Sequence, residues 1–121
     1  MKKRVLSASD IIDAQIDSVW QPTPEWGGKD AGVFIRGMTG AERETFEEDV
    51  QKYRDEGQSI KAVRARLVAT CAVDEDGNRI FTDDHIDTLN AKSAAVLDRL
   101  FDAVLSMSGI APGDQERLAK N

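Results

Sequence analysis

The sequence contains few of the residues from which catalytic and metal sites are usually built. Its 121 residues include one cysteine and one histidine. An internal disulfide needs two cysteines, and a zinc site needs three or four nitrogen or sulfur ligands at close spacing. Apolar runs are only a few residues long, whereas a membrane-spanning helix needs roughly 18. We therefore expect no disulfide, no metal site, no cofactor and no transmembrane segment.

Positive charge is also scarce. The chain has 16 Lys and Arg residues against 22 Asp and Glu residues, a formal net charge of −6, which repels the phosphates of nucleic acids and anionic lipids. Residues Met1 to Arg4 are basic, but the apolar stretch of a signal peptide does not follow them. We expect a cytoplasmic protein that binds neither nucleic acid nor membranes, and in which the thiol of Cys71 is a small buried apolar group.

Length and composition fit one ordinary globular domain. Hydrophobic residues make up 40% of the chain and charged residues 31%, and a chain of this size buries roughly two-thirds of its unfolded surface. A core can therefore form without disulfides. We expect a single domain over residues 1–110 and a short tail over residues 111–121, where apolar side chains are sparse.

Two helices begin with capping-box patterns, in which a hydroxyl side chain is followed three residues later by a carboxylate. Ser7 and Asp10 form the first pattern, and this helix is expected to end at about Ala14. Thr39 and Glu42 form the second. The second helix has an apolar stripe and ends near a glycine, and these residues are Phe46, Val50, Tyr53 and Gly57.

A β-hairpin is predicted between these two helices. Residues 16–20 and 32–37 are enriched in β-branched and aromatic side chains, which favours strands. The connection contains Pro22 and Pro24, each of which disfavours helical geometry in the residue before it. Residues 26–30 have the composition of a turn, so no helix is expected between the strands.

The second half of the chain is predicted to be mainly helical. The segment before a turn at residues 74–78 fits periods of 3.6 and 2 equally, and its alanines favour a helix of about 14 residues. Residues 79–81 predict a short extended return. Thr82 is expected to cap the longest helix, whose apolar face continues to Leu105 before Gly109 stops it. These elements predict an α+β fold, a small and mostly helical domain with an N-terminal β-hairpin packed on three main helices.

The candidate catalytic and metal-binding patterns fail when they are tested. A calcium loop with Gly77 at its sixth position places Ala72 at the first ligand position, where an oxygen-bearing side chain is required. A Cys71 and His85 pair is conceivable, but His85 falls at the third position of a capped helix, which favours a solvent-facing ring. The sequence has no Gly-x-Ser-x-Gly elbow and no Walker phosphate loop. We predict that the protein is not an enzyme.

Binding to other proteins is the remaining function class. Trp20 and Trp26 flank the proline-containing loop instead of lying within a periodic apolar face. At least one is expected to close the hairpin onto the core, and an exposed one is an anchor of the kind enriched in binding hot spots. With Arg36, Ile110 and Leu118 they are the predicted partner-binding residues, because all five lie outside the strongest core periodicities.

Several sequence blocks follow one another along nearly the whole chain. They are SASDII at 7–12, PEWGG at 24–28, VFIRGMTGAERETFE at 33–47, VDEDGNRIFTDDHIDTL at 73–89 and NAKSAAVLDRLFDAVLSMSGI at 90–110. In this order they resemble the tail assembly chaperones of bacteriophages with long, non-contractile tails and of prophages. The combination is more specific than any single block.

The resemblance implies a non-enzymatic protein that coats the tape-measure protein, helps to recruit the tail-tube subunits formed by the major tail protein, and leaves the finished particle. It also allows a homo-oligomer. Members of this family are often extended by a one-base backward ribosomal slip, and Ala119 to Asn121 can be encoded by GCA AAA AAC, which contains a slippery run. Two other functions stay open, namely another phage structural component, such as a head-tail connector or minor tail protein, and a small bacterial regulatory domain that binds proteins.

Overall fold

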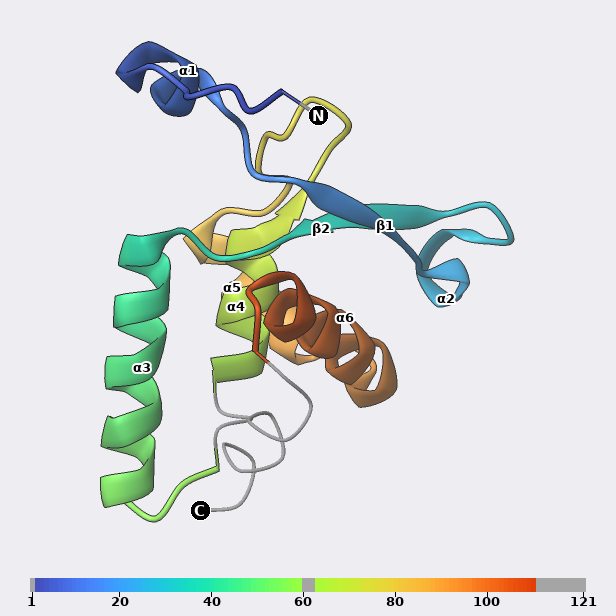
Figure 1. Ribbon diagram of the computed structural model, residues 1–121. Coiled ribbons are helices and arrows are strands. Elements are labelled where there is room, and N and C mark those ends of the chain that lie inside the picture. Colours follow the sequence, from blue (N-terminus) through green and yellow to red (C-terminus); the bar gives the residue numbers. More distant parts are fainter. Residues whose placement is uncertain (1, 60–62, 111–121) are drawn as a thin grey trace.

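The computed structural model describes residues 2–59 and 63–110, and it confirms the predicted α+β class (Figure 1). A small antiparallel sheet has helices packed against one face. In chain order the elements are α1 (Ala8–Asp13), β1 (Ser18–Pro22), α2 (Pro24–Gly27), β2 (Gly32–Arg36), α3 (Gly40–Asp55), α4 (Arg64–Cys71), β3 (Ala72–Val73), the 3-10 helix η2 (Asp83–His85), α5 (Ile86–Asn90) and α6 (Ala94–Met107).

The sheet has the strand order β1-β2-β3, and both pairs are antiparallel. Val19, Ile35 and Ala72 are register partners, and Ile35 and Ala72 are fully buried against the helices. Because side chains alternate between the two faces of a strand, the pair Trp20 and Phe34 lies on the opposite, outer face. The predicted hairpin is confirmed, whereas β3 was not predicted because its residues were assigned to the preceding helix.

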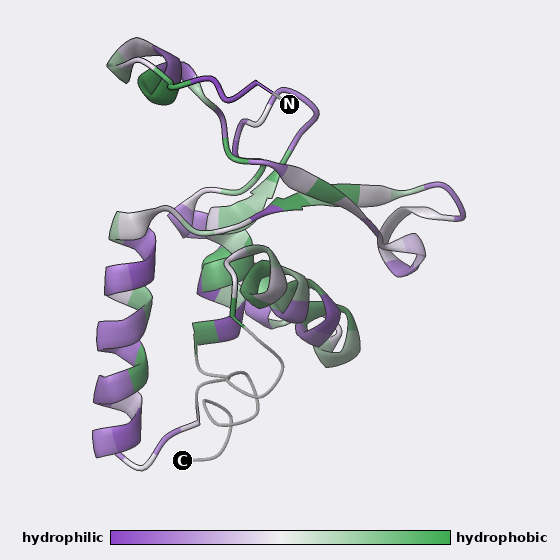
Figure 2. Ribbon diagram, in the orientation of Figure 1, coloured by the Kyte–Doolittle hydropathy of each residue, from purple (hydrophilic) through white to green (hydrophobic). Residues whose placement is uncertain are grey.

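Helices α4 and α6 form the centre of the core. Figure 2 shows α6 as mostly hydrophobic and α3 as mostly hydrophilic. The predicted helix before the turn is confirmed over Arg64–Cys71, and it buries residues around most of its circumference, which explains why its sequence fits two periods. Residues 60–62 lie outside the described part. The core residues of α3, α4 and α6 are Phe46, Val50, Ala65, Leu67, Val68, Ala69, Cys71, Val96, Leu97, Leu100, Phe101, Val104 and Leu105.

Helix α2 contradicts the prediction that the proline-containing connection excludes a helix. Pro24 occupies the start of α2, where its missing N–H needs no intrahelical partner and its fixed φ suits the helix. Proline disfavours helical geometry in the residue before it. That residue, Thr23, is non-helical, with φ −132° and ψ 63°. The short helix brings Trp26 against the core.

The predicted long helix after Thr82 is interrupted. It consists of η2, α5 and α6, with a break at residues 91–93. The Ser93 side chain accepts a hydrogen bond from the Val96 amide and so starts α6; serine competes for backbone hydrogen bonds in this way at helix starts. The apolar face itself was predicted correctly, because Leu89 of α5 shares the core with α6. Among the described helices α3 is the longest.

The first part of the chain makes little contact with the packed domain. Ser7 and Asp10 form the predicted capping box, yet α1 has no buried residue, and every residue from 2 to 20 is exposed. Figure 1 shows α1 standing away from the sheet. We call residues 2–16 the N-terminal arm. Residues 1–110 were predicted as one globular domain, and the structure divides their described part into this arm and a packed body.

Gly37 sets how closely the end of β2 approaches the end of α6. A Cβ atom at this position would lie 2.5 Å from the Met107 carbonyl oxygen, well inside van der Waals contact. The neighbouring Met38 amide donates a hydrogen bond of 2.9 Å to the Ser108 side chain. Only a residue without a side chain fits at Gly37.

We expect Gly37→Ala to lower the free energy of unfolding by about 1–3 kcal/mol, as is usual for an overpacked site. Gly40→Ala is the matched control, because a Cβ atom at Gly40 meets nothing within 4 Å and alanine favours the helix. Urea denaturation of the two variants measures the difference. Equal stability of the two variants would contradict the close approach at Gly37.

Candidate functional site

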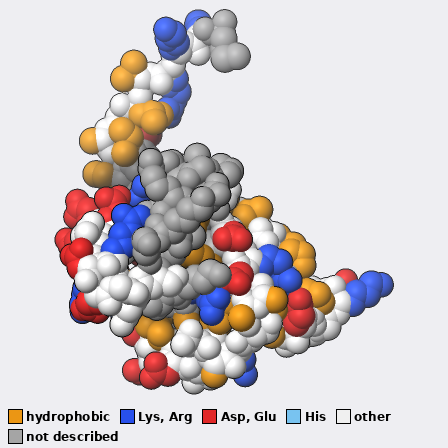
Figure 3. Space-filling view, turned by 90° about the horizontal axis from the view of Figure 1, so that it is seen from below, with side chains coloured by type: hydrophobic (Ala, Val, Ile, Leu, Met, Phe, Trp, Pro, Cys, Tyr) orange, Lys and Arg blue, Asp and Glu red, His pale blue; other side chains and the backbone are white. Residues whose placement is uncertain are grey.

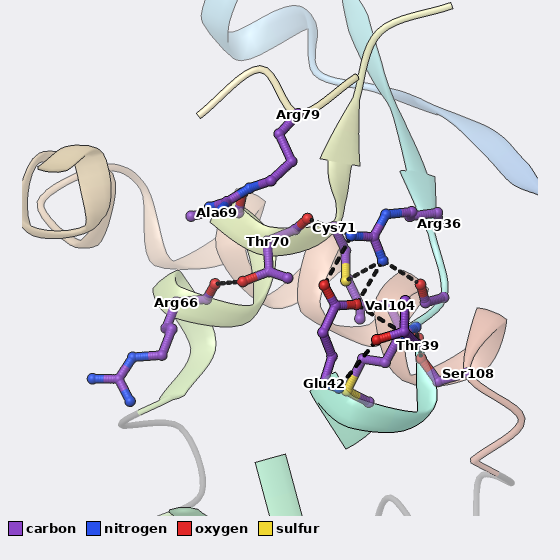
Figure 4. A network of polar contacts seen from close by, with 12 residues as sticks. Arg36, Thr39, Glu42, Arg66, Ala69, Thr70, Cys71, Arg79, Val104 and Ser108 are labelled. Carbon is purple, nitrogen blue, oxygen red and sulfur yellow. Dashed lines mark hydrogen bonds and ion pairs between the residues drawn. The ribbon is translucent and has the colours of Figure 1, made fainter. Parts of the chain in front are cut away.

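Arg36 lies inside the packed body. Its side chain is 13% exposed, and its guanidinium donates to the two carboxylate oxygens of Glu42 at 2.7 and 3.0 Å. It also donates to the carbonyl oxygens of Gly37 at 2.8 Å and Thr70 at 3.2 Å (Figure 4). Arg36 was predicted to contact a partner. Its donors are directed at groups of its own chain, which gives it a structural role, and its contact with a partner stays a prediction.

A second arginine, Arg79, also donates hydrogen bonds to a carbonyl group at the C-terminal end of α4 (Figure 4). Its Nε and Nη2 groups donate to the Ala69 carbonyl oxygen at 3.2 and 3.1 Å. Ala69 and Thr70 belong to the last turn of α4, where carbonyl groups have no intrahelical N–H partner. Arg36 and Arg79 supply the missing donors, and their positive charge also suits the negative end of the helix.

Cys71 and His85 are each engaged in the fold. Cys71 is fully buried as predicted, and burial raises the pKa of its thiol to about 12, so the thiol stays protonated at neutral pH. His85 is exposed as predicted, and its Nδ1 accepts a hydrogen bond of 2.9 Å from the Thr82 amide. Across residues 2–59 and 63–110, no three His, Cys, Asp or Glu side chains group so as to hold a metal ion.

The other predicted partner-binding residues differ in exposure. Trp26 is half-buried against the core, and Trp20 is 43% exposed, so one tryptophan closes the hairpin while the other remains accessible. Ile110 is only 4% exposed. It packs into the core directly after α6, so little of it is accessible in this structure, and its contact with a partner stays a prediction. Leu118 lies outside the described residues.

Accessible apolar side chains gather on the N-terminal arm and beside it. Trp20 packs edge-on against Phe34, with ring centroids 5.2 Å apart, and we call these two residues the aromatic face. Figure 3 shows hydrophobic side chains along the arm and basic side chains near its tip. The aliphatic residues of the arm, with their exposed fractions, are Val5 (96%), Leu6 (52%), Ile11 (60%), Ile12 (79%) and Ile16 (46%).

Sequence reasoning missed the aliphatic residues of the arm, although a signal was present. The predicted helix was short and had few apolar positions, and so small an element buries little of its surface by itself. Its apolar pair, Ile11 and Ile12, is not repeated three or four residues further along the helix, so no apolar stripe forms that could hold the helix against a core.

A groove of about 240 Å³ lies between α3 and α4. Phe46, Val63 and Leu67 contribute apolar lining, and Thr45 lines it from an exposed position on α3. The volume is below the roughly 300–1,000 Å³ of small-molecule sites, so the groove suits a few side chains of a protein segment. Helix α3 is acidic, with six carboxylates against three basic side chains in Gly40–Asp55.

Comparisons with known proteins do not assign the chain to a family. A scan against protein-family models gives no match, and neither the search of curated proteins nor the search of solved structures finds one. Within the described part of the chain, every helix is too short or too polar to cross a membrane.

The Arg36 hydrogen bond lowers the pKa of Glu42 below its ordinary value of 4.5. A carboxylate with a depressed folded-state pKa stabilises the protein above its unfolded pKa, and this contribution is lost as the pH falls through the folded value. We expect Glu42→Gln to lower the free energy of unfolding by about 1–3 kcal/mol near neutral pH. The gap to wild type should shrink as the pH falls below 4.5, and urea denaturation at a series of pH values measures it.

The control for this pH series is Glu44→Gln, an exposed carboxylate on the same helix. It should follow the wild-type stability at each pH. A gap between Glu42→Gln and wild type that stays constant from neutral to acidic pH would show that the Arg36 contact is not the source of the stabilisation.

We expect the Cys71 thiol to be alkylated by iodoacetamide at least about 100-fold more slowly in the folded protein than in the urea-unfolded chain. The reason is that the reactive thiolate is disfavoured and the sulfur is buried. Mass spectrometry of timed samples gives both rates. Comparable rates in the two states would mean that the thiol is accessible in the native protein.

Proposed function

We propose that this protein is a tail assembly chaperone of a long-tailed bacteriophage or prophage. It binds the tape-measure protein and the major tail protein in the cytoplasm of the bacterial host while the tail is built, and it catalyses no reaction. The order of the blocks PEWGG, RGMTGAER and DEDGNRIFTDDH supports this family. The exposed apolar surface supports protein binding as its mode of action.

The observation that carries the proposal is the aromatic face beside the apolar arm. Trp20 at 43% exposure and Ile12 at 79% keep apolar area in water that a protein partner would cover. Clustered apolar surface of this kind marks interaction sites on soluble proteins. Tryptophan is also enriched among the few residues that dominate binding energy.

The charge and size of the protein suit a chaperone that acts in many copies. A net charge of −6 keeps a small protein soluble although it exposes apolar side chains. A small apolar contact gives weak binding per copy, and repeated contacts along one long partner add up through multivalency. Each copy can then be displaced when a tail-tube subunit takes its place.

We expect Trp20→Ala to weaken binding to the tape-measure protein at least about tenfold, the effect of losing an aromatic anchor. Trp20→Phe should retain most of the affinity, because it keeps a ring against Phe34. Co-purification with the tagged tape-measure protein encoded in the same gene cluster, followed by titration calorimetry, measures the effect. Lys29→Ala, an exposed change in the hairpin loop, is the control and should bind like wild type.

Unchanged affinity of a folded Trp20→Ala variant would remove the aromatic face from the binding site. A chaperone should also be missing from purified virions. Detection of the protein in virions at a fixed copy number would favour a connector or minor tail protein. The lack of a tape-measure gene nearby would favour a bacterial regulatory domain.

A further inference from the structure

The N-terminal arm and the α3–α4 groove have complementary properties. The arm exposes aliphatic side chains, and its tip carries Lys2, Lys3 and Arg4. The groove has an apolar lining, and the helix on one side of it has an excess of carboxylates. Apolar side chains of the arm would fill the groove while its basic tip meets the acidic helix.

The arm of a chain does not reach the groove of the same chain in this structure. Its base lies beside the turn at residues 74–78, where Gln15 and Ile16 share a surface depression with Gly77. Figure 1 shows the arm on one side of the sheet and helices α3 and α4 extending on the other. A second copy meets no such restriction.

We propose that the N-terminal arm of one copy of this chain docks in the α3–α4 groove of a second copy. The two surfaces belong to different parts of the chain, so the contact is heterologous: each bound copy still offers a free arm at one end and a free groove at the other. Copies therefore associate head to tail into open chains or closed rings. The aromatic face takes no part in this contact and stays available for another protein.

The test uses the purified full-length chain alone and measures its mass by light scattering and sedimentation from low to high micromolar concentration. We expect the average mass of wild type to rise with concentration. Ile12→Asp changes an exposed arm residue, and Thr45→Arg places a bulky cation at an exposed position of the groove. Each change should weaken association at least about tenfold. Gln51→Arg adds the same charge elsewhere on the exposed surface of α3 and should associate like wild type.

Mixing the two blocked variants separates this contact from other kinds of association. Ile12→Asp retains an intact groove and Thr45→Arg an intact arm, so their mixture should form a 1:1 complex that grows no further. A Thr45→Arg variant that associates as wild type does would overturn the proposal in favour of arm-to-arm pairing. Wild type that stays monomeric throughout would overturn it as well. Because no tape-measure protein is present, either failure is distinct from a failure of the proposed chaperone function.

Discussion

Helix α4 ends inside the packed body, and its last carbonyl groups need hydrogen-bond donors there. The Ala72 amide reaches the Val68 carbonyl, and the Ala69 and Thr70 carbonyls receive the guanidinium groups of Arg79 and Arg36. A buried polar group without a partner costs about 1–3 kcal/mol, so the most buried helix depends on two arginines from outside it. Because Arg36 ends β2 and Arg79 follows β3, these hydrogen bonds hold both segments against the C-terminal end of α4.

Glu42 extends the same arrangement to α3. Its carboxylate pairs with Arg36 and also accepts a hydrogen bond of 2.9 Å from the Thr39 amide, which closes the capping box. The start of α3 and the end of α4 are thus joined through a single partly buried ion pair. The block RGMTGAER contains this pair as well as the close approach at Gly37. This block of the resemblance therefore contains residues that make contacts within the fold. Ile11 and Ile12 of the block SASDII are different, because in the described structure they support no core.

The sequence predicted local features better than burial. Both capping boxes, the hairpin and the apolar face completed by Leu89 could be predicted, because each depends on neighbouring residues or on a helical period. The break before Ser93 was missed because serine is tolerated inside helices and caps them only in context. The burial of Arg36 and Ile110 was not predicted, because a residue outside a periodic face is either exposed or buried by another element, and only the tertiary structure decides. Trp20 also lies outside a periodic face, and in its case the side chain is exposed.

The division into a packed body and an unsupported arm has a consequence for binding strength. A helix of six residues is marginal in water without tertiary contacts. In the described structure α1 has the cap formed by Ser7 and Asp10 and an exposed ion pair between Arg4 and Asp10, but no buried residue. A partner that covers Ile11 and Ile12 must also hold the arm in one conformation. The favourable free energy of burying these side chains is therefore partly offset by the conformational entropy that the arm loses. We therefore expect a contact made by the arm to be weak and reversible for each copy even though it is apolar. Such contacts suit a protein that coats a partner and then leaves, and they explain how an apolar arm can be exposed without making the association permanent.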